Sequence, residues 1–141
     1  MIYQKMNTLE TYLKKHKQTI VYFYPKDDTP GCTIEAKDFN IHKEVFNKND
    51  IGIVGISKDS EASHCKFIEK HHLSIDLIAD EDLSLHKKFG ARGEKNMYGK
   101  IVQWTIRSTF LLDQKWKIIK ERRNVRANGH VEKTIEELDI K

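Results

Sequence analysis

Cysteine, proline and tryptophan are scarce in this chain of 141 residues, and each occurs only twice. The two cysteines, Cys32 and Cys65, are too few for a disulfide-dense scaffold or for a zinc site made of cysteine alone. In a reducing compartment both would rest as thiols. If either cysteine has a function, we therefore expect it to act as a reactive group.

Long apolar runs are missing as well. No uncharged stretch approaches the roughly 20 apolar residues that a transmembrane helix needs. The N-terminal segment lacks the apolar region and the small-residue cleavage site of a signal peptide. The sequence thus predicts a cytoplasmic protein without a membrane partner.

The composition that remains is that of a globular protein. Hydrophobic residues make up 38% and charged residues 33% of the chain, which excludes disorder for most of it. The length predicts a single domain spanning residues 1–141. The net charge is +4, but lysines and glutamates are interspersed, so we expect a solvated surface and no nucleic-acid partner.

Strand-like and helix-like patterns alternate along the chain. Three strands separated by helices are followed by a short helix, a polar loop, two strands joined by a tight turn at residues 113–114, and a last helix. This order predicts an α/β thioredoxin-like fold, with a central mixed β-sheet flanked by helices on both faces. We expect helices at residues 7–17, 32–47, 60–72, 83–89 and 130–138, strands at 19–24, 51–57, 77–79, 105–112 and 115–122, and the polar loop at 91–103.

Cys32 occupies the most informative position, since it follows a buried strand and a loop that holds both prolines, and it opens a helix. Free N–H groups and the helix dipole at such an end favour an anion, so a thiol there is expected to ionise readily and act as a nucleophile. The alternative is a small buried hydrophobe, which is how most free cysteines behave. Position alone leaves both interpretations open.

The neighbourhood of Cys32 carries a more specific signal. Pro25, Thr29 and Cys32 form the pattern P-x-x-x-T-x-x-C within YFYPKDDTPGCTIEAKDF, and this segment closely resembles the active-site motif of the peroxiredoxins. The resemblance extends over roughly residues 18 to 138. It includes the segment IRSTFLLD at 106–113, similar to the strand that carries the family's active-site arginine, and the short motifs Gly55-Ile56-Ser57, Ser63-His64, Lys66-Phe67, Met97-Tyr98-Gly99-Lys100 and Gly129-His130 of the bacterioferritin comigratory protein, or peroxiredoxin Q, branch.

The resemblance implies a role for each matching residue. Cys32 would be the peroxidatic nucleophile, and Thr29 a hydroxyl that accepts a hydrogen bond from the peroxide while donating to it or to the thiolate. Arg107 would be the fixed cation beside the sulfur and the departing oxygen, a role that suits its permanent charge and rigid fork of donors. Backbone N–H groups near Gly31 would add donors, and Pro30 would shield the sulfur.

Glu35 and Arg107 also have plainer interpretations. The resemblance implies that Glu35 orients the arginine, although an acid in the first turn of a helix is favourable without any catalysis. Arg107 can be a surface charge and Thr29 a turn or cap hydroxyl. An arginine inside an otherwise apolar strand, as expected for residues 105–112, calls for a functional partner.

The chain departs from the family pattern where the oxidised cysteine must be reduced again. Many relatives place a resolving cysteine five residues after the nucleophile, and Lys37 stands there in this chain. Cys65 is the remaining candidate. Either Cys65 joins an apolar stripe with Ala62 and Ile68, or Phe67 and His71 define the inner face and Cys65 points about 160° away from Phe67, toward solvent. Periodicity does not decide between them.

Other departures concern structure and metals. By the resemblance, we expect the N-terminal hairpin of the family to be shortened in this chain, and Trp104 and Trp116 stand where relatives commonly have glycine. His64 and His71 share a helix face beside His72 but lack ligand partners at a recognised zinc spacing, so no metal site is predicted.

The resemblance implies a thiol-dependent peroxidase that needs no cofactor and reduces hydrogen peroxide and organic hydroperoxides. Thioredoxin or a similar dithiol protein would be the reductant, and the enzyme would be a monomer or at most a weak dimer. A different class of function also fits: a cysteine-based redox sensor or chaperone-like binding protein with little turnover.

Overall fold

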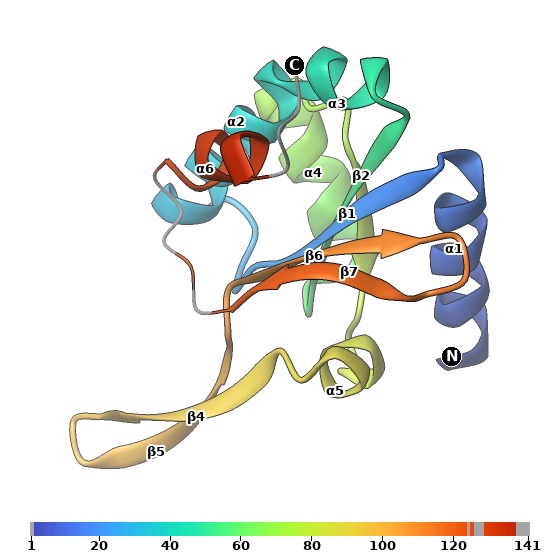
Figure 1. Cartoon of the computed structure of the whole chain (residues 1–141). Coiled ribbons are helices and arrows are strands. Elements are labelled where there is room, and N and C mark those ends of the chain that lie inside the picture. Colours follow the sequence, from blue (N-terminus) through green and yellow to red (C-terminus); the bar gives the residue numbers. More distant parts are fainter. Residues whose placement is uncertain (1, 124, 126–128, 138–141) are drawn as a thin grey trace.

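A five-stranded sheet forms the centre of the computed structural model, which describes residues 2–123, 125 and 129–137 (Figure 1). The strand order is β3-β2-β1-β6-β7. Strands β1, β2 and β3 are parallel, and β6 runs antiparallel to both β1 and β7, so the sheet is mixed as predicted. The strands are β1 (Gln18–Phe23), β2 (Ile51–Ser57), β3 (Asp76–Ala79), β6 (Ser108–Asp113) and β7 (Ile118–Arg122).

Helices cover both faces of this sheet, which confirms the predicted thioredoxin-like arrangement (Figure 1). Two hydrophobic clusters mark the two faces: α1 and α5 pack into one, and α2, α3, α4 and α6 into the other. The helices are α1 (Ile2–Lys15), α2 (Pro30–Ile41), α3 (Lys43–Lys48), α4 (Glu61–His71), α5 (Ser84–Phe89) and α6 (His130–Glu137). Not one of the described helices is long and apolar enough to cross a membrane.

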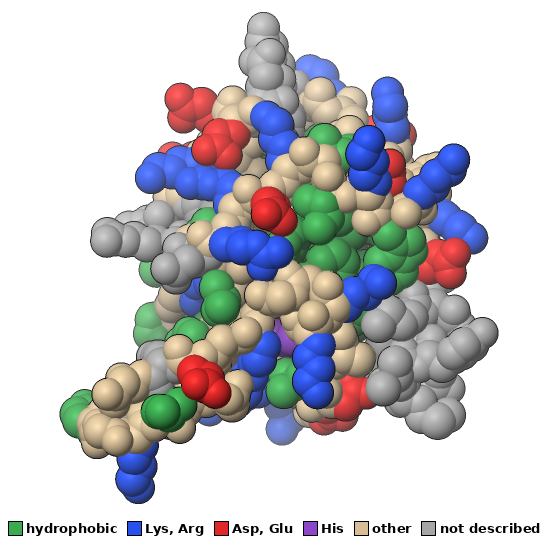
Figure 2. All heavy atoms as spheres, turned by 60° about the horizontal axis from the view of Figure 1, so that its bottom comes forward, with side chains coloured by type: hydrophobic (Ala, Val, Ile, Leu, Met, Phe, Trp, Pro, Cys, Tyr) green, Lys and Arg blue, Asp and Glu red, His purple; other side chains and the backbone are tan. Residues whose placement is uncertain are grey.

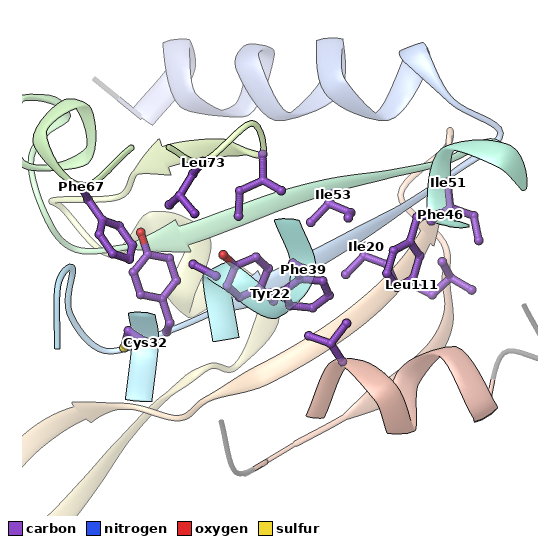
Figure 3. Close-up of a cluster of buried hydrophobic side chains, with 14 residues drawn as sticks. Ile20, Tyr22, Cys32, Phe39, Phe46, Ile51, Ile53, Phe67, Leu73 and Leu111 are labelled. Atoms are coloured by element: carbon purple, nitrogen blue, oxygen red, sulfur yellow. The ribbon is translucent and has the colours of Figure 1, made fainter. Parts of the chain in front are cut away.

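Strand β1 lies in the middle of the sheet, and the run of β-branched and aromatic residues predicted there is buried on both faces. Ile20 and Tyr22 belong to the cluster under α2, whereas Val21 and Phe23 face α1 and α5. Figure 3 shows the first cluster, with Cys32 at one end. The nucleophile candidate is therefore attached to the most buried part of the molecule.

Two predicted helices differ in extent from the observed ones. The first begins at Ile2, not at residue 7, and ends at Lys15. The helix expected over residues 32–47 is two helices in the structure, because the helical conformation is interrupted at His42. The backbone of His42, with φ of −92° and ψ of 6°, departs from the helical conformation and ends α2 at this point, while the His42 ring contacts the Asp38 carbonyl at 2.8 Å.

The prediction of a polar loop over residues 91–103 is wrong, because this segment forms a β-hairpin. Strands β4 (Arg92–Met97) and β5 (Lys100–Thr105) form a separate two-stranded sheet. Tyr98 and Gly99 join them with positive φ angles of 54° and 81°, as two-residue hairpin turns require. The hairpin projects from the body (Figures 1 and 2), so neither of its faces needs the apolar alternation that identifies a strand.

The final hairpin turns later than predicted. Its second strand, β7, begins at Ile118, because residues 113–117 form a longer turn in which the Asp113 carboxylate accepts the N–H groups of Lys115 and Lys117. Trp116 has a positive φ of 70° in this turn, at a place where the family commonly has glycine.

Candidate active site

Cys32 lies in the first turn of α2, directly after the loop of residues 25–29, hereafter the active-site loop. Thr29 is the N-cap residue and Pro30 the first residue of the helix. Gly31 and Cys32 follow, and N–H groups in the first helical turn have no partner within the helix. Cys32 is only 1% exposed, so its side chain is buried at the positive end of the helix.

Arg107 joins the two other groups that the resemblance brings to this site. Its Nη2 donates to Cys32 Sγ at 3.3 Å, and its Nη1 donates to Glu35 Oε1 at 2.6 Å. The guanidinium thus holds the thiol and the carboxyl with two different nitrogens. The contact places the permanent positive charge of Arg107 directly beside the Cys32 sulfur.

The backbone around Arg107 corrects the prediction that it lies inside a strand. The segment expected as one strand over residues 105–112 is interrupted, since β5 ends at Thr105 and β6 begins at Ser108. The Arg107 carbonyl instead accepts the N–H of Val125 at 2.9 Å. The arginine therefore projects from a short connection between two sheets, where it can reach α2 without breaking the apolar pattern of β6.

Glu35 is fully buried one helical turn after Cys32. Burial raises the pKa of Glu35 to about 7, although the charge of Arg107 and its hydrogen bond act in the opposite direction. Burial likewise acts to lower the pKa of Arg107, but Glu35 and Cys32 outweigh it and raise that pKa. The buried carboxyl is therefore held against the Arg107 guanidinium. An exposed acid that only stabilised the helix start would not be held in this way.

A cavity of about 240 Å³ opens beside these residues, and Pro25, Thr29 and Arg107 line it together. Thr29 Oγ1 donates to the Lys26 carbonyl at 2.9 Å and makes no capping bond to the helix, which leaves its lone pairs available to accept. Pro30 is exposed at the helix start. The other lining residues are Lys26, Lys58, Arg92, Gln103, Trp104 and Thr105, so four of the nine lining side chains, counting Arg107, are cationic.

The second cysteine lies outside this arrangement. Cys65 is a free, exposed thiol on α4, whereas Cys32 is free and buried. Of the two predicted orientations of α4, the one with Phe67 on the inner face is confirmed, because Phe67 is buried and Ala62 is exposed. Lys37, in the family's common resolving position, is also exposed.

The histidines considered for a metal site have other partners in the structure. His64 is buried and contacts the Asp27 carboxylate at 2.7 Å, and His71 contacts Asp28 at 2.8 Å. His72 ends α4 in the left-handed conformation. Sequence reasoning missed Asp27 and Asp28 as partners. The signal was two adjacent aspartates in the active-site loop and two histidines seven residues apart on one helix face.

Comparisons with known proteins agree with this geometry. The chain matches the AhpC/TSA family over residues 3–121. It is 43% identical to the peroxiredoxin Bcp of Bacillus subtilis over 124 residues, which cover 88% of this chain and 79% of the relative.

Solved structures give the same picture. The bacterioferritin comigratory protein of Xanthomonas campestris, described in connection with alkyl peroxide reduction, superimposes with a TM-score of 0.83 at 40% identity, covering 89% of this chain and 79% of that one. A mutant of Xylella fastidiosa PrxQ superimposes with a TM-score of 0.85 at 35% identity, covering 93% and 80%. Because these matches span most of the chain and most of each relative, this chain belongs to the AhpC/TSA family and, within it, to the peroxiredoxins of the Bcp branch.

Proposed function

We propose that this peroxiredoxin reduces hydrogen peroxide and organic hydroperoxides with Cys32 as its nucleophile. The thiolate sulfur attacks one peroxide oxygen, the O–O bond breaks, and a sulfenic acid forms on Cys32. The second oxygen leaves with the bonding electron pair and takes a proton, which gives water or an alcohol. The step needs no cofactor, because the sulfur supplies the electron pair.

The observation that carries this proposal is the contact of Arg107 with both Cys32 and Glu35. Negative charge moves during the reaction from the sulfur to the departing oxygen, and a fixed cation beside both positions stabilises that movement. Glu35 orients the guanidinium through the other nitrogen. Thr29 and the free N–H groups of the first turn of α2 supply further hydrogen bonds to the peroxide, within the cavity that Pro25 borders.

Recycling of the sulfenic acid is proposed to depend on an external thiol, with thioredoxin or a related dithiol protein as donor. Cys32 is buried and Cys65 points to solvent, so the folded structure does not favour a disulfide bond between them. Lys37 removes the route within α2 that many relatives use. We further propose that the chain acts as a monomeric single domain in a reducing cytoplasm, which suits two free thiols.

A steady-state assay tests the proposal: peroxide consumption is followed with thioredoxin, thioredoxin reductase and NADPH. We expect Cys32→Ser to abolish turnover. Arg107→Ala should slow the reaction with peroxide on the order of 10²-fold or more, as loss of a preorganised donor does. The exposed Lys37→Ala on the same helix is the control. Full turnover in Cys32→Ser refutes the nucleophile, and a single stoichiometric burst with every reductant indicates a redox sensor.

A further inference from the structure

A buried cluster of polar side chains joins the active-site loop to α4. Asp27, in the middle of this loop, is only 7% exposed. Its carboxylate accepts hydrogen bonds from the Tyr24 hydroxyl at 2.6 Å and from the Ser63 hydroxyl at 2.8 Å, and it contacts His64 Nδ1 at 2.7 Å. Two of these three partners are consecutive residues of α4. The carboxylate is therefore surrounded by groups that hold the loop in place.

Both ring nitrogens of His64 face oxygen acceptors. Nε2 lies 3.0 Å from the Ile78 carbonyl, which can only accept, and Nδ1 faces the Asp27 carboxylate. A neutral imidazole has one N–H, which Nε2 uses on the Ile78 carbonyl, so Nδ1 can donate to an ionised Asp27 only in the imidazolium form. Burial acts to lower the pKa of His64, but the hydrogen bond and charge of Asp27, aided by the Ile78 carbonyl and Asp59, raise it overall.

The pKa of Asp27, the partner of His64, is also shifted toward the charged form. Burial acts to raise the pKa of Asp27, but the hydrogen bonds from His64 and Tyr24 outweigh it and the pKa is lowered. Asp27 and His64 therefore form a buried ion pair. Removing one member of such a pair leaves an uncompensated charge in the interior, which makes the pair a strong fastening.

A second fastening lies beside the first. Asp28 contacts Lys70 Nζ at 2.7 Å and His71 Nε2 at 2.8 Å, and both belong to α4. Lys70 and His71 follow Ser63 and His64 by seven residues, or about two helical turns, so all four lie on one face of the helix. We call this set of contacts, from Asp27 and Asp28 to α4, the clasp.

The clasp bears on the access of a reductant to Cys32. A small peroxide can enter the cavity beside Arg107, but a thiol on another protein cannot reach a sulfur that is 1% exposed. The active-site loop has to move before the sulfenic acid can be reduced from outside. We propose that Asp27 and His64 are positioning residues: their contact holds Cys32 beside Arg107 for attack on peroxide, and its release exposes the oxidised sulfur to the thiol donor.

This inference rests on the proposed function and is tested by measuring two reactions of the same thiol. In a Cys65→Ser chain, Cys32 is the only thiol. One measurement is the single-turnover rate with hydrogen peroxide, and the other is alkylation by a polyethylene glycol maleimide too large for the cavity. Adding Asp27→Asn should lower the first rate and raise the second, each about tenfold or more, because the loop opens more often.

The matched control is Asp50→Asn in the same background. Asp50 contacts His16 at 3.1 Å and precedes β2, at the end of the sheet away from the active-site loop. We expect both rates to stay within about twofold of the parent. The inference is overturned if Asp27→Asn behaves like Asp50→Asn, or if both of its rates change in the same direction.

A second measurement needs only the Cys65→Ser parent, and it decides the matter if Asp27→Asn does not fold. The ratio of alkylation by the large maleimide to that by N-methylmaleimide cancels the fraction of thiolate. This ratio should rise as the pH rises through the pKa of His64, because the ion pair is then lost. A ratio that stays flat overturns the inference. If the parent reacts with peroxide no faster than a free thiol, it is the proposed function that fails, and the alkylation ratio still tests the clasp.

Discussion

At the scale of single residues, Glu35 has the most unusual environment in the site. It is fully buried, and its partner Arg107 also contacts the Cys32 sulfur. Burial raises the pKa of Glu35 from 4.5 to about 7. A carboxyl whose pKa is raised in the folded protein stabilises the fold below its ordinary pKa, and this stabilisation is lost as the pH rises through the folded value.

The first prediction follows from the direction in which the raised pKa of Glu35 makes stability depend on pH. Between about pH 4.5 and 7 the unfolded chain has already lost the Glu35 proton while the folded chain still binds it. The free energy of unfolding of the native chain, minus that of Glu35→Gln, should therefore fall with rising pH, by up to about 1.4 kcal/mol per pH unit. Urea unfolding at several pH values measures this difference. Glu44→Gln, which removes an exposed carboxylate on α3, sets the baseline.

A difference that does not change across this window would show that Glu35 is already ionised at pH 5. The arginine would then be fully neutralised by its partner at every working pH. A falling difference would show instead that the charge balance beside Cys32 changes near neutrality. Because Arg107 contacts Cys32 and Glu35 together, the pH dependence of peroxide reduction should then include the titration of Glu35.

At the scale of elements, strand β2 has two glycines with different neighbours. A Cβ built on Gly55 would lie 2.7 Å from Leu77 and 2.8 Å from the Tyr22 ring and its hydroxyl. Tyr22 is buried and stacks on Phe39 with ring centroids 4.5 Å apart, so it cannot turn aside. The glycine allows the packing of β2 against β1 beneath the site.

We therefore expect Gly55→Ala to destabilise the protein by about 1–3 kcal/mol, as overpacking of a core does. The matched control is Gly52→Ala in the same strand. Its Cβ would meet the His16 ring at 2.6 Å, and that side chain is partly exposed and can rotate. The destabilisation caused by Gly52→Ala is then limited to losing the contact of His16 with Asp50, about 1 kcal/mol or less. Equal losses in urea unfolding would contradict this account.

The elements also show where sequence patterns stop being informative. Buried strands such as β1 and β2 are predictable because both faces exclude water and nearly all of their residues are apolar, β-branched or aromatic. The β4–β5 hairpin escaped prediction, since its strands project into solvent and its turn, Tyr98-Gly99, has only one of the two residues that favour positive φ. The end of α2 at His42 is a local change of backbone conformation, which hydrophobic periodicity does not record.

At the scale of the whole molecule, the site gathers residues that are far apart in the sequence. Cys32 and Arg107 are 75 positions apart and meet only because β6 pairs antiparallel with β1. The family motifs could identify Cys32 and Arg107 as site residues from the sequence, because these motifs come from proteins that share this topology. The contact of Asp27 with His64 had no such motif and required the path of α4 beside the active-site loop.

The two thiols lie in different surroundings at this scale, and that difference predicts the product of oxidation. Cys32 is 1% exposed at the start of α2, and Cys65 is exposed to solvent on α4. A bond between them needs the start of α2 and the clasp to open together, whereas oxidation of Cys32 needs neither. After one equivalent of peroxide and no reductant, we expect the intact mass to increase by one oxygen atom, in the native chain and in Cys65→Ser alike.

Mass spectrometry of the native chain separates this outcome from its rivals. Loss of two hydrogens, seen only when Cys65 is present, would identify an internal disulfide and make Cys65 the resolving residue. A doubled mass would identify a covalent dimer. In both cases the clasp has to open before any reductant arrives, so a bridge that formed as fast as peroxide was consumed would mean that Asp27 and His64 do not limit access to Cys32.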